Sequence, residues 1–136
     1  MKHNYNEEAI QKHAQLKGKI ETKAKAEVST EEDLSIYYTP GVGAVSKMLS
    51  ENPQEAKNYT IKSNTVAVVS DGSAVLGLGN VGPEAALPVM EGKAMLFKEL
   101  AGVDAFPICL DTQDPEEIIK TVKNIAPVFA GVNLKN

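Results

Sequence analysis

The spacing of apolar residues predicts a helical first third of the chain. Over residues 6–25 apolar side chains recur at i+3 and i+4 spacings, which predicts an amphipathic helix. The apolar stripe of this helix is too narrow for the segment to fold alone, so we expect the helix to pack on the body of the domain or on a second subunit. Ser29 and Glu32 have the spacing of a capping box for a short helix. Further helices are predicted over 42–50 and after Pro53.

From Thr65 onward, β-branched runs alternate with helical patterns. Two apolar runs flank the dipeptide Asp71-Gly72, which is typical of a type I′ turn and predicts a β-hairpin. Four elements are predicted after it: a helix over 83–100, a buried strand over 104–111, a helix from Pro115 and a strand over 127–134. The resulting order, β-β-α-β-α-β, predicts an α/β domain whose later strands can pair in parallel.

Size and composition restrict the function classes. The 136 residues allow one domain with a hydrophobic core, and the net charge of −4 offers no electrostatic footprint for nucleic acid or an anionic membrane. All 14 basic residues are lysines, so an anionic ligand must be bound without arginine's bidentate fork. The single cysteine, Cys109, lies in an apolar run and is interpreted as a packed thiol rather than a nucleophile. With no leader and no membrane-length apolar run, we expect a cytoplasmic protein.

A glycine motif stands between the predicted hairpin and the long helix. Gly77, Gly79 and Gly82 spell G-x-G-x-x-G, the pattern of a dinucleotide-binding turn. That fold places an acid about 20 residues further on, whereas Asp111 follows Gly82 by 29 residues. Three interpretations stay open: a dinucleotide site, a structural glycine-rich turn, and an active-site wall that approaches substrate or nicotinamide through its backbone.

Lys93 lies on the apolar face of the long predicted helix. The positions at −7, −3, +4 and +7 from it are all apolar: Ala86, Met90, Phe97 and Leu100. A lysine on such a face must extend to solvent, pair with an acid or line a cavity, where loss of solvent favours a neutral amine that can act as a general base. The neighbouring Gly92 would let another chain segment approach closely, while Glu84, Glu91 and Lys98 indicate a solvated face.

Three long segments resemble a known family. The stretches YTPGVGAV, SDGSAVLGLGNVGPEAALPVMEGKAMLFKELAGVDAFPICLDTQDPEEI and IAPVFAGVNL resemble the N-terminal, catalytic-side domain of bacterial malic enzymes, over about Val28 to Leu134. These enzymes oxidise L-malate with NAD or NADP and decarboxylate the product to pyruvate and CO2, using Mg2+ or Mn2+. The resemblance implies a three-layer α/β domain of the amino-acid-dehydrogenase-like type, with a mixed sheet and flanking helices. We expect one domain over 1–136, with 1–27 as a protruding helical segment.

The resemblance also implies roles for individual residues. The tyrosine of the family's Tyr-Thr-Pro motif falls on Tyr38, the expected general acid that protonates enolpyruvate. The lysine of its Glu-Gly-Lys-Ala motif falls on Lys93, the expected base toward the malate hydroxyl. Gly77, Gly79 and Gly82 would then form a loop that faces substrate or nicotinamide.

Two departures from the family pattern limit what we expect of this chain alone. The family's metal-binding Glu-Asp pair falls on Lys135 and Asn136, so we expect no metal ligand here, and Ala74 stands where some members place an arginine. We expect the NAD(P)-binding domain to be absent, and the isolated chain to bind no cofactor and to be inactive. A homodimer is expected, with malate as the small-molecule substrate. The alternative is a truncated, inactive dimerisation or binding module; a minimal dinucleotide-binding module using Gly77 to Gly82 ranks last.

Overall fold

A three-stranded parallel sheet forms the centre of the protein. The structure is a computed structural model that describes residues 3–135. Its strands are β1 (Thr65–Ser70), β2 (Asp104–Cys109) and β3 (Gly131–Leu134), in the order β2-β1-β3. Both pairings are parallel, and Val66 lies opposite Ala105 on one side and Gly131 on the other. The central strand is buried on both faces, which explains its nearly continuous apolar sequence.

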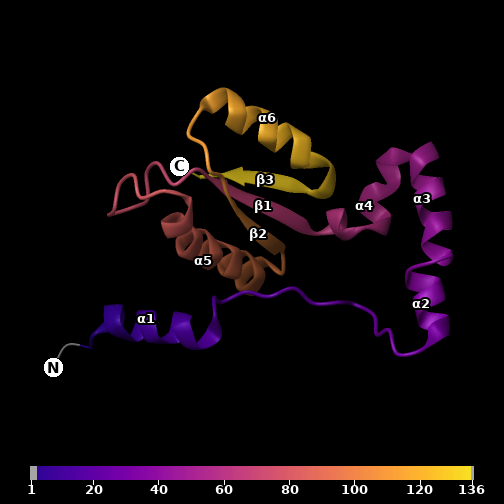
Figure 1. Cartoon of the computed structure of the whole chain (residues 1–136), viewed down its shortest axis with the longest axis horizontal. Helices are drawn as coiled ribbons and strands as arrows, with labels where there is room; N and C mark the ends of the chain where they lie inside the picture. The colour runs from indigo at the N-terminus through magenta and orange to yellow at the C-terminus, as the bar shows by residue number, and fades with distance from the viewer. Residues whose placement is uncertain (1–2, 136) are drawn as a thin grey trace.

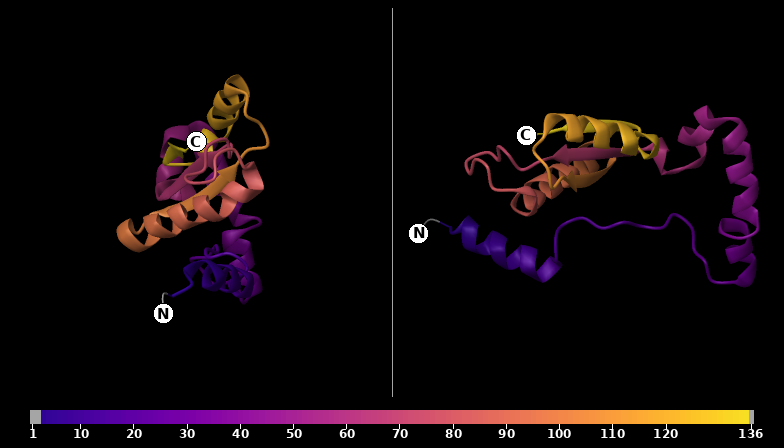
Figure 2. Two further views of the ribbon diagram at one scale, coloured as in Figure 1. Left: turned by 90° about the vertical axis from the view of Figure 1, so that its left-hand side faces the viewer. Right: turned by 45° about the horizontal axis from the view of Figure 1, so that its top comes forward.

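Helices cover the two faces of this sheet. α5 (Pro83–Ala101) lies on one face and α6 (Pro115–Ile125) on the other, so the domain has three layers (Figures 1 and 2). The side chains at the centre of the core are Ala67, Val68 and Val69 of β1, with Ala86, Met90 and Ala94 of α5. The α/β class and the layered architecture predicted from the sequence are confirmed. Pro83 occupies the first turn of α5, and Gly102 ends the helix in the left-handed conformation, as such residues commonly do.

The predicted hairpin is wrong, and the sheet is parallel rather than mixed within residues 3–135. After β1 the chain enters an irregular loop over 71–82, whose only strand-like feature is a bridge between Val75 and Gly79. The carbonyl of Gly72 accepts hydrogen bonds from the backbone amides of Val81 and Gly82. A β-carbon on Gly72 would collide with the Gly82 carbonyl oxygen, so this closure requires glycine. The Asp-Gly dipeptide therefore closes a loop instead of turning a hairpin.

The first helix is shorter than predicted. α1 (Tyr5–Leu16) ends because Lys17 and Gly18 both take positive φ, at 56° and 97°. An extended segment then leads to α2 (Glu31–Tyr37) and α3 (Gly41–Glu51) (Figure 1). The capping box of α2 is formed by Thr30 and Asp33, not by the predicted Ser29 and Glu32.

Short helical turns connect the remaining elements. η1 (Pro53–Glu55), α4 (Ala56–Tyr59) and η2 (Ile61–Ser63) lead from α3 into β1, and η3 (Ala126–Val128) precedes β3. The last strand is therefore shorter than the predicted 127–134. No helix within residues 3–135 is long and apolar enough to cross a membrane.

α2 and α3 and the glycine loop lie at opposite ends of the sheet. Figures 1 and 2 show β1 running from α4 toward the loop over 71–82, with α2 and α3 beyond its amino end. α2 packs chiefly on α3, and both stand apart from α5 in these views. The protein therefore consists of a layered body and an arm, which we define as residues 21–52.

Candidate functional site

The carboxyl edge of the sheet is the natural ligand edge of this fold. Because all three strands are parallel, the loops after β1 and β2 and the end of β3 lie along one edge. The connections after β1 and β2 lead to opposite sides of β1, which makes this edge a topological switch point. Open α/β sheets bind their ligands at such points. The glycine loop (71–82) and the N-terminal end of α5 both lie at this edge.

The glycine loop does not have the geometry of a dinucleotide turn. In that turn the first glycine directly follows the strand, whereas Gly77 comes seven residues after Ser70, the end of β1. Gly77, Gly79 and Gly82 all have positive φ, at 81°, 79° and 87°, and Leu76 between strand and helix is 95% exposed. The described residues of this loop therefore do not fit a bound pyrophosphate.

Asp71 holds the start of this loop. Its Oδ1 accepts hydrogen bonds from the Ser73 hydroxyl at 2.6 Å and the Ser73 amide at 2.9 Å. The Ser73 hydroxyl is the main cause that lowers the pKa of Asp71 below its usual value, although partial burial opposes the shift. A negative charge therefore persists at the carboxyl end of the central strand.

Lys93 lies on the flank of α5 that borders the core. The residues three and seven positions before it, Met90 and Ala86, are buried, and Lys93 itself is half-buried. The predicted inward stripe fails at Leu100, which is 81% exposed in the last turn. Lys98 donates to Asp104 at 2.8 Å, but no ion pair within residues 3–135 involves Lys93.

Tyr38 is placed away from that helix. It caps the C-terminus of α2: its amide donates to the Leu34 carbonyl at 2.8 Å, and its carbonyl accepts from the Val42 amide at 2.6 Å. Its side chain is 63% exposed. The structure fixes the backbone of Tyr38 but does not bring its arm to α5 within one chain (Figure 1).

The described residues do not form a cage for Mg2+ or Mn2+. No group of three His, Cys, Asp or Glu residues within 3–135 could hold a metal ion. Lys135 directly follows β3, donates its amide to the Val69 carbonyl at 2.7 Å and has an exposed side chain. Asn133 has a buried carboxamide oxygen with no partner in that range, but one neutral oxygen is not a cation site. Asn136 lies outside the described residues.

Glu91 binds the N-terminal segment, so its predicted place on a solvated face is wrong. Its Oε1 accepts from the backbone amides of Lys19 at 2.5 Å and Ile20 at 3.2 Å. Gly92 faces the same segment, and a β-carbon there would lie 3.4 Å from Cε of Lys19, an ordinary van der Waals contact that does not require glycine. Lys19 also contacts His13, with 2.6 Å between Nζ and Nε2. The Glu91 contact therefore fastens the segment just before the arm to the helix that carries Lys93.

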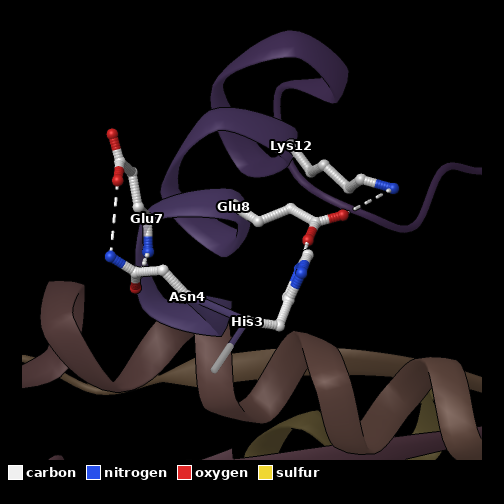
Figure 3. Close-up of polar contacts among 5 residues, drawn as sticks. All are labelled: His3, Asn4, Glu7, Glu8 and Lys12. Atoms are coloured by element: carbon white, nitrogen blue, oxygen red, sulfur yellow. Dashed lines mark hydrogen bonds and ion pairs between the residues drawn. The ribbon is translucent and has the colours of Figure 1, made fainter. Parts of the chain in front are cut away.

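Two other features have structural explanations. A polar cluster at the start of α1 (Figure 3) joins Asn4 to Glu7 and Glu8 to both His3 and Lys12, all within α1 and the two residues before it. The hydrogen bond from His3 is the main cause that lowers the pKa of Glu8. Cys109 is half-buried, and burial raises the pKa of its thiol, which fits a packing role.

Comparison with known proteins places the chain in a family. Residues 17–136 match the malic enzyme N-terminal domain. The chain belongs to the malic enzyme N-terminal domain family. It is 67% identical over 119 residues to an NAD-dependent malic enzyme of Geobacillus stearothermophilus, covering 88% of this chain and 25% of that protein. It is 45% identical to an NADP-dependent malic enzyme of Escherichia coli, covering 88% of this chain and 16% of that protein.

Solved structures agree with this assignment to the malic enzyme family. The crystal structure of an NAD-dependent malic enzyme from Thermotoga maritima superimposes with a TM-score of 0.90 at 56% identity, covering 93% of this chain and 36% of that one. This malic enzyme domain thus spans between about a sixth and a third of the length of these relatives. The sequence resemblance and the fold lead to the same family.

Proposed function

We propose that this chain is the catalytic-side domain of an NAD(P)-dependent malic enzyme, which converts L-malate to pyruvate and CO2. The observation that carries the proposal is Lys93, a half-buried lysine without an ion-pair partner in residues 3–135, on the helix that follows the glycine loop. The related malic enzymes are named as NAD-dependent or NADP-dependent, so the choice of nicotinamide is left as NAD or NADP. We further propose a cytoplasmic location, in keeping with a single free cysteine.

The proposed chemistry uses one proton acceptor and one proton donor from this domain. Lys93 accepts the proton of the malate C2 hydroxyl when malate is oxidised to oxaloacetate. Cleavage of the C3–C4 bond then releases CO2 and leaves enolpyruvate. Tyr38 protonates C3 to give pyruvate and regains its proton from water, while Lys93 releases to water the proton that it took from the malate hydroxyl. An amine screened from solvent and a phenol suit these two roles near neutral pH.

The glycine loop has a passive role in this proposal. When bound, the nicotinamide supplies the hydride acceptor, and Gly77, Gly79 and Gly82 provide a backbone wall without side chains beside it. Because the described residues do not fit a divalent metal, no step of the proposed mechanism is assigned to Mg2+ or Mn2+ in this domain.

A homodimer would complete this site. Tyr38 belongs to an arm that stands apart from α5 of its own chain, so the partner's arm is the natural source of the phenol. Apolar side chains on this arm and on α1 lack cover, among them Ile36 at 56%, Leu34 at 49% and Ile10 at 73% exposure. Such surfaces are typical of regions that pack against another subunit.

Substitution of the two proposed catalytic residues tests the function. We expect Lys93→Ala and Tyr38→Phe each to lower kcat for malate-dependent NAD(P)+ reduction by roughly 100- to 10,000-fold, the usual contribution of a general acid or base. The measurement is the initial rate of nicotinamide reduction by the complete protein. Lys98→Ala on the same helix and Tyr37→Phe beside Tyr38 serve as matched controls. Unchanged rates in both test variants would remove the assigned roles.

A second candidate function is a binding or dimerisation module without catalysis. Lys135, at the position of the family's first metal carboxylate, favours this alternative because a protonated lysine repels Mg2+. The two functions separate by experiment: the module binds malate or dimerises but shows no turnover in the complete protein supplied with NAD, NADP and Mn2+.

A further inference from the structure

A reciprocal pair of side-chain amides joins two loops at the carboxyl edge of the sheet. Asn80 Nδ2 donates to Gln113 Oε1 at 3.2 Å, and Gln113 Nε2 donates to Asn80 Oδ1 at 2.9 Å. Asn80 belongs to the glycine loop, and Gln113 lies between β2 and α6. Each side chain therefore satisfies both the donor and the acceptor of the other.

Apart from the first bond of α5, in which the Ala86 amide donates to the Gly82 carbonyl, this pair is the one hydrogen-bonded connection from residues 74–82 to another element of the described fold. The other bonds of the glycine loop stay local: Val75 bonds with Gly79, and the amides of Val81 and Gly82 bond to Gly72. Three glycines at positive φ make this backbone permissive, since glycine adopts many conformations at similar energy. With Leu76 and Leu78 exposed at 95% and 67%, packing of these two side chains adds no second attachment. Val75, at 5% exposure, packs in the core and holds the first half of the loop, so the attachment of the exposed segment 76–80 to a neighbouring loop depends on Asn80 and Gln113.

The pair also lies where it can affect a bound ligand. β1 and β2 are adjacent parallel strands, so the loops that follow them meet at the ligand edge of the sheet. A connection between these loops limits how far they can separate at that edge, where the helix bearing Lys93 begins. It does so without contacting the proposed catalytic groups.

We propose that Asn80 and Gln113 are positioning residues that hold the glycine loop against the β2–α6 connection, and that binding of malate at this edge depends on this attachment. The inference rests on the proposed function for the identity of the ligand. The attachment itself is independent of that function, because it is a property of the loop alone.

Amide hydrogen exchange, followed by NMR on this chain, tests the attachment. We expect Asn80→Ala and Gln113→Ala each to speed exchange of the amides of 76–80 by roughly 5- to 10-fold, the effect of losing about one net hydrogen bond. The double variant should exchange no faster than either single variant, because both lose the same pair. Unchanged exchange at 76–80, or multiplying effects in the double variant, would overturn the proposal. Unaltered exchange in β1 verifies that each variant is folded.

A pair of oppositely charged substitutions provides a test by rescue. Asn80→Asp combined with Gln113→Lys should restore slow exchange through an ion pair. Asn58→Ala, which removes an exposed amide bond to Glu55 in another part of the chain, is the matched control and should leave 76–80 unchanged. Failure of the rescue would show that the loop responds to something other than the pair.

Malate separates the positioning role from the proposed function. With saturating malate, we expect slower exchange at 76–80 in the unaltered chain and at least a 5-fold weaker malate affinity in Asn80→Ala, as one lost attachment implies. In the complete protein the rise in KM for malate should exceed the fall in kcat. No effect of malate on the unaltered chain would count against the proposed function, even where the exchange data support the attachment. Malate affinity equal in the variant and the unaltered chain would overturn the positioning role.

Discussion

At the residue scale, one carboxylate determines where the N-terminal segment lies. Glu91 accepts hydrogen bonds from the backbone amides of Lys19 and Ile20, which are distant from it in the sequence. Gly18, at φ 97°, turns the chain so that these amides come within reach. We expect Glu91→Ala to speed amide exchange of Lys19 and Ile20 by roughly 10- to 100-fold, because a charged acceptor contributes about 1.5–3 kcal/mol in a part-buried setting. Gly18→Ala should give the same result, since its β-carbon would lie 2.6 Å from Oε1 of Glu91.

Glu84 offers the matched control for this contact. It is an exposed acid on the same helix, and no hydrogen bond within residues 3–135 involves its side chain. Glu84→Ala should therefore leave exchange at Lys19 and Ile20 unchanged. Equal exchange in Glu91→Ala and the unaltered chain would mean that the segment is held by its apolar contacts instead.

At the scale of elements, α2 depends on its capping box. Asp33 Oδ2 accepts from the amides of Ser29 and Thr30 at 3.1 and 3.2 Å, and the Asp33 amide donates to the Thr30 hydroxyl at 3.1 Å. The backbone hydrogen bond from Ser29 is the main cause that lowers the pKa of Asp33. The stabilisation is therefore complete above the ordinary aspartate pKa of about 3.9 and is lost as the pH falls through the lower folded-state value.

Helix content over 31–37 measures this dependence. We expect the Cα chemical shifts of α2 to move toward coil values below about pH 4 in the unaltered chain, and at all pH values in Asp33→Asn. Glu32→Gln is the control, because Glu32 lies beside Asp33 in the first turn but takes no part in the capping box. A pH response of α2 that is the same in Asp33→Asn as in the unaltered chain would contradict the assignment.

The elements also show what the sequence could and could not predict. α5 and α6 were predictable, because periodicity, Pro83, Pro115 and Gly102 all act within a few residues of the helix ends. The hairpin failed because Asp71-Gly72 is a local signal, whereas the loop is closed by bonds between Gly72 and residues about ten positions later. The inward flank of Lys93 followed from helical spacing, but Tyr38 was found only through the family resemblance.

Contacts between residues distant in the sequence explain the other features that were not predicted. Helical spacing alone predicts that Glu91 faces solvent, but Glu91 binds the N-terminal segment. Nothing in the spacing of Asn80 and Gln113 along the chain indicates that their side chains form hydrogen bonds. The end of α1 carried a signal in Gly18, since a glycine after a run of helix formers commonly ends the helix. A lysine-rich stretch that continued beyond that glycine concealed it.

At the scale of the whole molecule, the arm and the body carry separate halves of the proposed site. α2, which ends at Tyr38, lies beyond the amino end of β1, and the glycine loop lies beyond its carboxyl end (Figure 2). If a partner's arm supplies the phenol, a subunit lacking Tyr38 and a subunit lacking Lys93 can complement each other. Subunits that work alone cannot do so, because each variant lacks one required group.

Mixing the two inactive variants of the complete protein therefore decides between these arrangements. Equal amounts of Tyr38→Phe and Lys93→Ala subunits, dissociated and reassociated together, should recover about a quarter of the unaltered rate, since half of the dimers are mixed and each has one intact site. Light scattering should give a dimer mass, and Ile36→Asp, which places a charge on the exposed face of α2, should reduce both the dimer fraction and the recovered rate. A monomer mass at micromolar concentration, or a mixture no more active than its separate components, would require Tyr38 to reach Lys93 within one chain. In that case the arm must fold back across the body, and the exposed apolar faces of α1 and α2 would have a purely intramolecular explanation.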